Sequence, residues 1–101
     1  MAAGLRAGLA VFDVTDSSAV NAGVAATAAE HGEIDVLVNN AGIQQRQPIE
    51  EFSDADWLRM MNANLNSAFF VARAVIPAMK ARRSGKIINI CSVLSFIARP
   101  N

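Results

Sequence analysis

The hydrophobic pattern of the chain centres on one short apolar run, Ile34 to Val38, in which only Asp35 is polar. Consecutive large aliphatic residues of this kind are typical of a parallel strand with both faces buried. Two asparagines, an alanine and Gly42 follow directly, and such small or amide side chains allow the backbone to approach a neighbour closely. Ligands of open α/β sheets bind at this carboxyl end of a strand, although the same residues could also form an ordinary tight turn.

Two further apolar runs predict strands. Residues 7–14, Ala-Gly-Leu-Ala-Val-Phe-Asp-Val, end in the pair Asp13-Val14. Residues 86–91 end at Cys91, and Ser92 leaves that strand at its carboxyl end. With the central run, these segments place polar side chains after three strand ends.

Two helices are predicted between the strands. Thr15 or Asp16 offers a side-chain oxygen for the start of the first helix, and Gly32 provides its left-handed end. Ser53 caps a longer helix, whose end we expect at Gly85. Apolar residues recur along this helix at intervals of three and four, so we expect one row to face a core. The row comprises Leu58, Met61, Leu65, Phe69, Ala72, Ile76 and Met79.

Strands that alternate with helices predict an α/β fold with a parallel sheet. The doubly wound strand order is 3-2-1-4-5-6, and the resemblance described below implies that the predicted strands correspond to the third, fourth and fifth. The last two are then neighbours, whereas residues 7–14 are separated from them by two strands that the chain does not supply. Residues 1–101 are therefore expected to be the central part of a single, larger Rossmann-like domain, and marginally stable alone.

Composition excludes several classes of partner. Lys plus Arg equals Asp plus Glu at nine each, so no net field favours nucleic acid or an anionic membrane. Cys91 is the only cysteine, which fits a reducing cytoplasm. No apolar run approaches the roughly 20 residues of a membrane helix, and Asp13 interrupts the start of any signal-peptide core. We expect a cytoplasmic protein with no metal site.

Asn39-Asn40-Ala41-Gly42 after an Ile-Asp-x-Leu-Val run resembles the short-chain dehydrogenase/reductase family, and further positions match in the same order over nearly all of residues 8–101. The resemblance implies an oxidoreductase that uses NAD or NADP on a small-molecule substrate, as a homo-oligomer when full-length. The family's glycine-rich turn would precede Met1, and its general-acid tyrosine and partner lysine would follow Asn101. Because the chain has no tyrosine, we expect it to be inactive alone.

The resemblance also implies which residues hold the cofactor. Asp13 and Val14 take the place of the pair that contacts adenine in the family; the alternative for Asp13 is that it accepts backbone hydrogen bonds at the helix start. Asn40, Ala41 and Gly42 correspond to residues that line the ribose.

Two residues correspond to the family's catalytic group. Asn64 lies in a segment that resembles the family's Asn-Leu-x-x-x-Phe, whose asparagine holds a water in the proton relay, so we predict a local helix distortion there. Ser92 resembles the serine that hydrogen-bonds the reacting oxygen of the substrate; the alternative is a simple turn residue. We expect Asn39 to tie neighbouring strands together, Cys91 to be structural, and Asn62 and Asn66 to be exposed.

Residues 42–48, 86–95 and 98–100 look most like family members that interconvert gluconate and 5-ketogluconate. A sugar acid carries a carboxylate, which Arg46 could bind with two hydrogen bonds; the alternative is a solvated loop cation. A 3-oxoacyl-carrier-protein reductase is the runner-up. A non-catalytic oligomerisation module built on the long helix is the third hypothesis. The choice between NAD and NADP depends on residues upstream of Met1.

Overall fold

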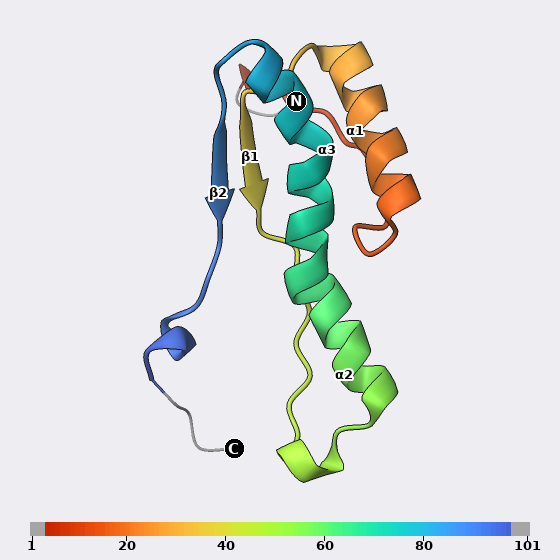
Figure 1. Cartoon of the computed structure of the whole chain (residues 1–101), viewed down its shortest axis with the longest axis vertical. Coiled ribbons are helices and arrows are strands. Elements are labelled where there is room, and N and C mark those ends of the chain that lie inside the picture. The colour runs from red at the N-terminus through yellow and green to blue at the C-terminus, as the bar shows by residue number, and fades with distance from the viewer. Residues whose placement is uncertain (1–3, 98–101) are drawn as a thin grey trace.

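The computed structural model describes residues 4–97. β1 and β2 form a parallel pair, α3 lies against the sheet, and α1 packs on α3 (Figure 1). This arrangement confirms the predicted α/β class with a parallel sheet. Residues 98–100, which contributed to the resemblance, lie outside the described part. The elements in chain order are α1 (Ser17–His31), β1 (Val36–Asn39), a 3-10 turn (Ile49–Glu51), α2 (Asp54–Met61), a π-helical turn (Asn62–Asn66), α3 (Ser67–Ala81), β2 (Lys86–Asn89) and a second 3-10 turn (Val93–Ser95).

The sheet pairs the two strands that were predicted to be neighbours. Its register runs from Val36 opposite Lys86 to Asn39 opposite Asn89. The prediction that the central strand is buried on both faces is wrong for the isolated chain, because Val36 and Val38 are each 50% exposed. A two-stranded sheet has no further strands beside it, and α3 covers only part of it.

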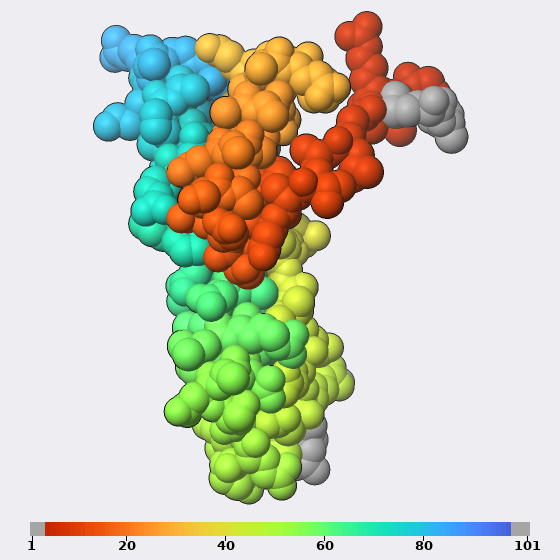
Figure 2. All heavy atoms as spheres, turned by 90° about the vertical axis from the view of Figure 1, so that its right-hand side faces the viewer, coloured from red at the N-terminus to blue at the C-terminus, as the bar shows by residue number. Residues whose placement is uncertain are grey.

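Residues 7–14 form no strand, contrary to the prediction. They run as irregular chain beside α1, and the N-terminal segment projects from the body of the molecule (Figure 2). Leu9 and Val11 are 89% and 87% exposed. A strand requires partner N–H and C=O groups, and in the predicted strand order the partners of this segment are strands that the chain does not contain.

The helix starts are confirmed. Asp16 caps α1, and its Oδ1 accepts hydrogen bonds from the N–H groups of Ser18 and Ala19 at 2.9 and 3.2 Å. Gly32 follows α1 with φ 91°, a backbone region that favours glycine. Ser53 Oγ accepts from the N–H of Asp56 at 3.1 Å and caps α2.

The predicted end of the long helix at Gly85 is wrong. α3 ends at Ala81, and Arg83 rather than a glycine takes the positive φ of 55°. Gly85 has a packing role instead, since a Cβ atom there would lie 2.5 Å from Cγ and Sδ of Met79.

The apolar row predicted to face a core is mostly the outer face of α2 and α3. Leu58, Leu65 and Phe69 are 57–58% exposed, and Met79, at 7%, is the one member of the row that is buried. The buried positions of this helical segment are Ala63, Ser67, Val75 and Met79. The segment carries apolar residues on more than one face, and contact with α1 and β1 decides which face is covered.

The core of the described chain is small. Its buried hydrophobic residues are Val20, Ala63, Val75 and Met79. The accessible surface is 7906 Å², whereas a compact monomer of 10.7 kDa would expose about 5,500 Å². The radius of gyration, 16.4 Å, also exceeds the roughly 13 Å of a compact chain of this length. No helix within residues 4–97 is both long and apolar enough to cross a membrane.

Candidate functional site

A cleft of about 470 Å³ lies where β1 and β2 end. Val14, Val38 and Cys91, which close the three segments singled out in the sequence, all line it. Asn40, Ala41 and Asn64 line the same cleft. Sequence reasoning did not anticipate the apolar wall of this cleft. Three of its members, Phe12, Leu37 and Ile90, belong to the predicted strands, and the others come from the long helical segment: Leu65, Ala68 and Val71.

Asn39 joins the two strands at the edge of this cleft. Its Nδ2 donates to Asn89 Oδ1 at 3.0 Å across the sheet and lies 3.4 Å from the Ala68 carbonyl oxygen. The expectation that Asn39 ties neighbouring strands together is confirmed.

Asn64 lies in the π-helical turn, which confirms the predicted helix distortion. Its Oδ1 accepts from the N–H of Ile43 at 2.7 Å, and its Nδ2 donates to the Ile43 carbonyl at 2.9 Å. A Cβ atom at Gly42 would lie 2.9 Å from Asn64 Oδ1. The lack of a side chain at Gly42 therefore makes room for the Asn64 amide, which fixes the loop after β1.

The expectation that Asn62 and Asn66 are exposed is wrong. Both are half-buried, and Asn66 Nδ2 donates to Asn62 Oδ1 at 2.8 Å. The π-helical turn brings these two amides together, so each meets part of the other's hydrogen-bonding capacity.

Ser92 follows Cys91 but is not among the residues that line the cleft. Its Oγ accepts from the N–H of Leu94 at 3.1 Å and caps the last 3-10 turn, so its hydroxyl hydrogen is available to donate. Cys91 is exposed and lines the cleft.

Asp13 accepts a backbone hydrogen bond near the start of α1, which is the alternative role given for it in the sequence analysis. Its Oδ1 accepts from Thr15 Oγ1 at 2.7 Å and from the Thr15 N–H at 2.8 Å. The hydroxyl bond, followed by the backbone bond, lowers the pKa of this exposed carboxyl below its ordinary value. Both bonds use one oxygen. Val14, the next residue, is half-buried against the cleft.

Arg46 is exposed and does not line the cleft. In the orientation of the Gln44 amide that satisfies both groups, the amide oxygen accepts from Arg46 Nε at 3.0 Å and from Nη2 at 3.1 Å. The guanidinium is therefore held by a neighbouring amide rather than by a carboxylate.

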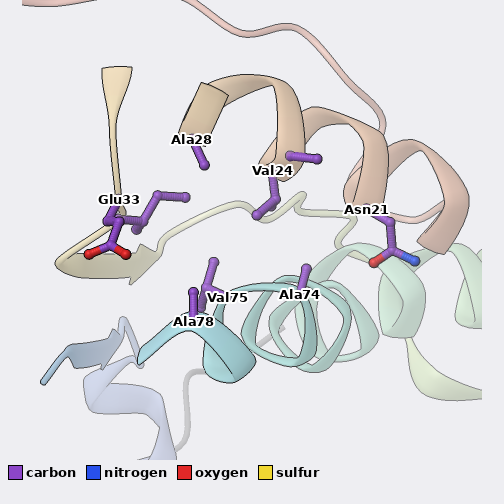
Figure 3. Close-up of a pocket in the computed structure, with 9 residues that line it drawn as sticks. Asn21, Val24, Ala28, Glu33, Ala74, Val75 and Ala78 are labelled. Atoms are coloured by element: carbon purple, nitrogen blue, oxygen red, sulfur yellow. The ribbon is translucent and has the colours of Figure 1, made fainter. Parts of the chain in front are cut away.

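A second hollow of about 340 Å³ lies between α1 and α3 (Figure 3). Its walls are mostly alanine and valine side chains, with Asn21 at one end and Glu33 at the other. The Glu33 carboxylate lies 3.4 Å from Arg82 Nε. This hollow brings no reactive groups together, and within residues 4–97 no cluster of His, Cys, Asp and Glu could hold a metal ion. The cleft at the strand ends is thus the better candidate site.

Comparison with known proteins identifies the family of the chain. The short chain dehydrogenase family profile matches residues 1–101. The chain is 58% identical to gluconate 5-dehydrogenase of Gluconobacter oxydans over 98% of its own length. It is 37% identical to a 3-oxoacyl-[acyl-carrier-protein] reductase of Thermotoga maritima over 89% of its length.

A solved structure of a family member is also similar to the chain. The crystal structure of a gluconate 5-dehydrogenase from Burkholderia cenocepacia, in complex with NADP and tartrate, superposes on 90% of the chain with a TM-score of 0.84 and 53% identity. The chain spans 39% of the length of the Gluconobacter relative and 36% of the Burkholderia protein. The parallel strands, the cleft at their ends and these matches together show that the chain belongs to the short-chain dehydrogenase family.

Proposed function

We propose that the full-length protein containing this chain is an NAD(P)-dependent oxidoreductase that interconverts an alcohol and a ketone of a sugar acid, with gluconate and 5-ketogluconate as the pair. The observation that carries the proposal is the meeting of Val14, Asn40, Ala41 and Asn64 in one cleft at the carboxyl ends of parallel strands. That is the position at which α/β sheets bind nucleotides.

The residues present fit one part of a dinucleotide. Asn40 and Ala41 would border a ribose, and the neighbouring Gly42, whose missing side chain makes room for the Asn64 amide, would lie beside it. Val14 would border adenine, and Asp13, which uses only Oδ1 for Thr15, would hold its amine. NADP is bound in the Burkholderia relative. When bound, the nicotinamide supplies the hydride chemistry.

The remaining residues act on the substrate and its proton. Ser92 would donate its hydroxyl hydrogen to the reacting oxygen, since its Oγ already accepts from Leu94. Asn64 fixes the loop after β1 and, by family resemblance, would hold a water of the proton relay. The general acid of the family is a tyrosine, which this chain does not contain. It would come from the rest of the protein.

Arg46 supports a substrate with a carboxylate. Its guanidinium is exposed in the loop that leaves β1 at the carboxyl end of the sheet, and no carboxylate of the described chain pairs with it. A planar guanidinium binds a carboxylate through two hydrogen bonds. The tartrate bound in the Burkholderia relative is a hydroxy acid of this kind.

The similarity to a 3-oxoacyl-[acyl-carrier-protein] reductase favours a second candidate. A purified full-length protein separates the two by its NAD(P)H-linked rates with 5-ketogluconate and with an acetoacetyl thioester. We expect reduction of the sugar acid at the higher kcat/KM. Preference for the thioester would replace the sugar-acid proposal, and no turnover of either compound would reject both.

The full-length protein is further proposed to be a homo-oligomer, in which the outer face of α2 and α3 meets a second subunit. Leu58, Leu65 and Phe69 are more than half exposed on this face, and Ile76 is 38% exposed. The Arg73 guanidinium lies 4.8 Å from the centre of the Phe69 ring and shields part of the face. A row of exposed apolar side chains of this kind is typical of a subunit contact.

A further inference from the structure

The π-helical turn (Asn62–Asn66) joins α2 and α3 into one long helical segment (Figure 1). At the end of this turn the N–H of Ser67 bonds to the carbonyl of Asn62, five residues earlier in the chain. In an α-helix the same N–H would bond to the carbonyl of Ala63, four residues earlier. The wider turn therefore takes from the Ala63 carbonyl the N–H donor that an α-helix would supply.

The side chain of Ser67 replaces that donor. Its Oγ donates to the Ala63 carbonyl oxygen at 2.6 Å. One residue thus serves two successive carbonyls, that of Asn62 through its backbone and that of Ala63 through its side chain. In a regular α-helix a hydroxyl bond of this kind is added to the backbone bond, whereas at Ser67 it stands in for the backbone bond.

Burial makes this hydroxyl bond important for the shape of the turn. Ser67 is 4% exposed and Ala63 is 8% exposed, and within residues 4–97 Ser67 is the one polar residue in the buried class. Water has little access to the Ala63 carbonyl at this exposure, and a buried carbonyl without a donor costs free energy. Without the hydroxyl, the α-helical bond from the N–H of residue 67 to Ala63 would become the favoured one.

The shape of the turn in its own right sets the position of Asn64. Asn64 lies within the turn, lines the cleft together with Ser67, and bonds both backbone groups of Ile43 through its amide. Successive residues of an α-helix are rotated by about 100°, so a return to α-helical bonding would rotate Asn64 relative to α3 by an angle of that order. The amide would then no longer meet Ile43.

We propose that Ser67 is a positioning residue, whose hydroxyl maintains the π-helical turn and thereby holds Asn64 against the loop after β1. This inference rests on the proposed function and deepens it, because Asn64 has its place there in the proton relay. Ser67 needs no contact with substrate or cofactor for this role, since its hydroxyl hydrogen is used within the helix.

The test uses full-length protein with Ser67→Ala, which removes the hydroxyl and introduces the best α-helix former. Hydrogen exchange measured by mass spectrometry reports on the segment that contains Ile43. We expect its exchange to become about tenfold faster, because the Ile43 N–H loses its acceptor. We also expect kcat for the reduction of 5-ketogluconate to fall about tenfold, while KM for the sugar acid and for NADPH changes less than about twofold.

Two further variants separate positioning from packing. Ser67→Thr keeps a hydroxyl that can bond to the carbonyl four residues earlier, so exchange and kcat should return towards the parent values. Thr27→Val is the matched control, because Thr27 Oγ1 donates to the Gly23 carbonyl at 2.8 Å within the regular helix α1. It removes the same kind of bond where no π-helical turn depends on it, so both quantities should equal those of the parent.

Unchanged exchange in Ser67→Ala would reject the proposal, because the turn would then persist without the hydroxyl. Faster exchange with an unchanged kcat would reject the positioning role in the reaction. If Ser67→Thr or Thr27→Val behaves like Ser67→Ala, the effect belongs to packing or to general stability, and the proposal is again rejected. If the parent protein reduces no sugar acid, the proposed function is rejected, while the exchange comparison still decides whether Ser67 holds Asn64 in place.

Discussion

A Cβ atom placed on Gly42 would lie 2.9 Å from Oδ1 of Asn64, the oxygen that accepts the N–H of Ile43 at 2.7 Å. A glycine in the loop after β1 and an amide in the π-helical turn are thus fitted to each other. The family motif that contains Gly42 therefore has a structural reason that needs no ligand.

Gly42→Ala is expected to push the Asn64 amide away from Ile43. The loss of one or two hydrogen bonds predicts about 1–2 kcal/mol lower stability in full-length protein, measured by urea unfolding. In an Asn64→Ala background the same change should cost much less, since the clash is gone. Asn66→Ala breaks a hydrogen bond that does not involve the loop and serves as the control background. If Gly42→Ala lowered stability equally in the parent and in the Asn64→Ala variant, the fit between Gly42 and Asn64 would be contradicted.

Gly85→Ala is expected to destabilise the protein through overpacking. The new methyl group would meet Cγ and Sδ of buried Met79 at 2.5 Å. Overpacking of this kind costs about 1–3 kcal/mol, so the thermal midpoint should fall. Ser84→Ala alters the preceding exposed residue and should leave the midpoint near the parent value. An unchanged midpoint for Gly85→Ala would show that Met79 can move aside.

Thr15→Val should raise the pKa of Asp13 towards its ordinary value, because it removes the hydroxyl bond that is the main cause of the lowering. Since folding lowers this pKa, the stabilisation is present above the pKa of the unfolded chain and is lost as pH falls through the folded value. A titration of the Asp13 carboxyl carbon by NMR measures the shift. Thr27→Val, whose hydroxyl bonds only the Gly23 carbonyl, should leave the Asp13 titration unchanged.

The 101-residue chain alone is expected to unfold without a sharp transition and to show no NAD(P)-linked turnover. Its buried hydrophobic core is small and β1 has an unpaired edge, so little apolar burial opposes the entropy of unfolding. Calorimetry and an activity assay on the purified chain check both statements. A cooperative transition together with turnover would contradict them.

Phe69→Asp is expected to convert the full-length oligomer to a smaller species. The ring is 58% exposed on the outer face of α3, and a charge there would have to be desolvated in a subunit contact. Light scattering after size exclusion measures the mass. Ile49→Asp, at a position that is 80% exposed in the turn before α2, is the control. An unchanged mass for Phe69→Asp would place the contact elsewhere.

The sequence alone determined the features that depend on neighbours in the chain. Helix starts at Asp16 and Ser53 follow from side chains that bond to N–H groups two or three residues later, and both were predicted. The two paired strands and the helix distortion at Asn64 were also predicted, the last through family resemblance. Apolar runs and caps are local signals, so the residues themselves carry them.

Only the tertiary structure decided which apolar surface is covered. The row that includes Leu58, Leu65 and Phe69 has helical spacing, yet contact with α1 and β1 buries the other side of the segment. Residues 7–14 read as a strand, but a strand exists only where a partner supplies hydrogen bonds. The fit of Gly42 to Asn64 and of Gly85 to Met79 likewise depends on distances between segments, which spacing along the chain does not contain.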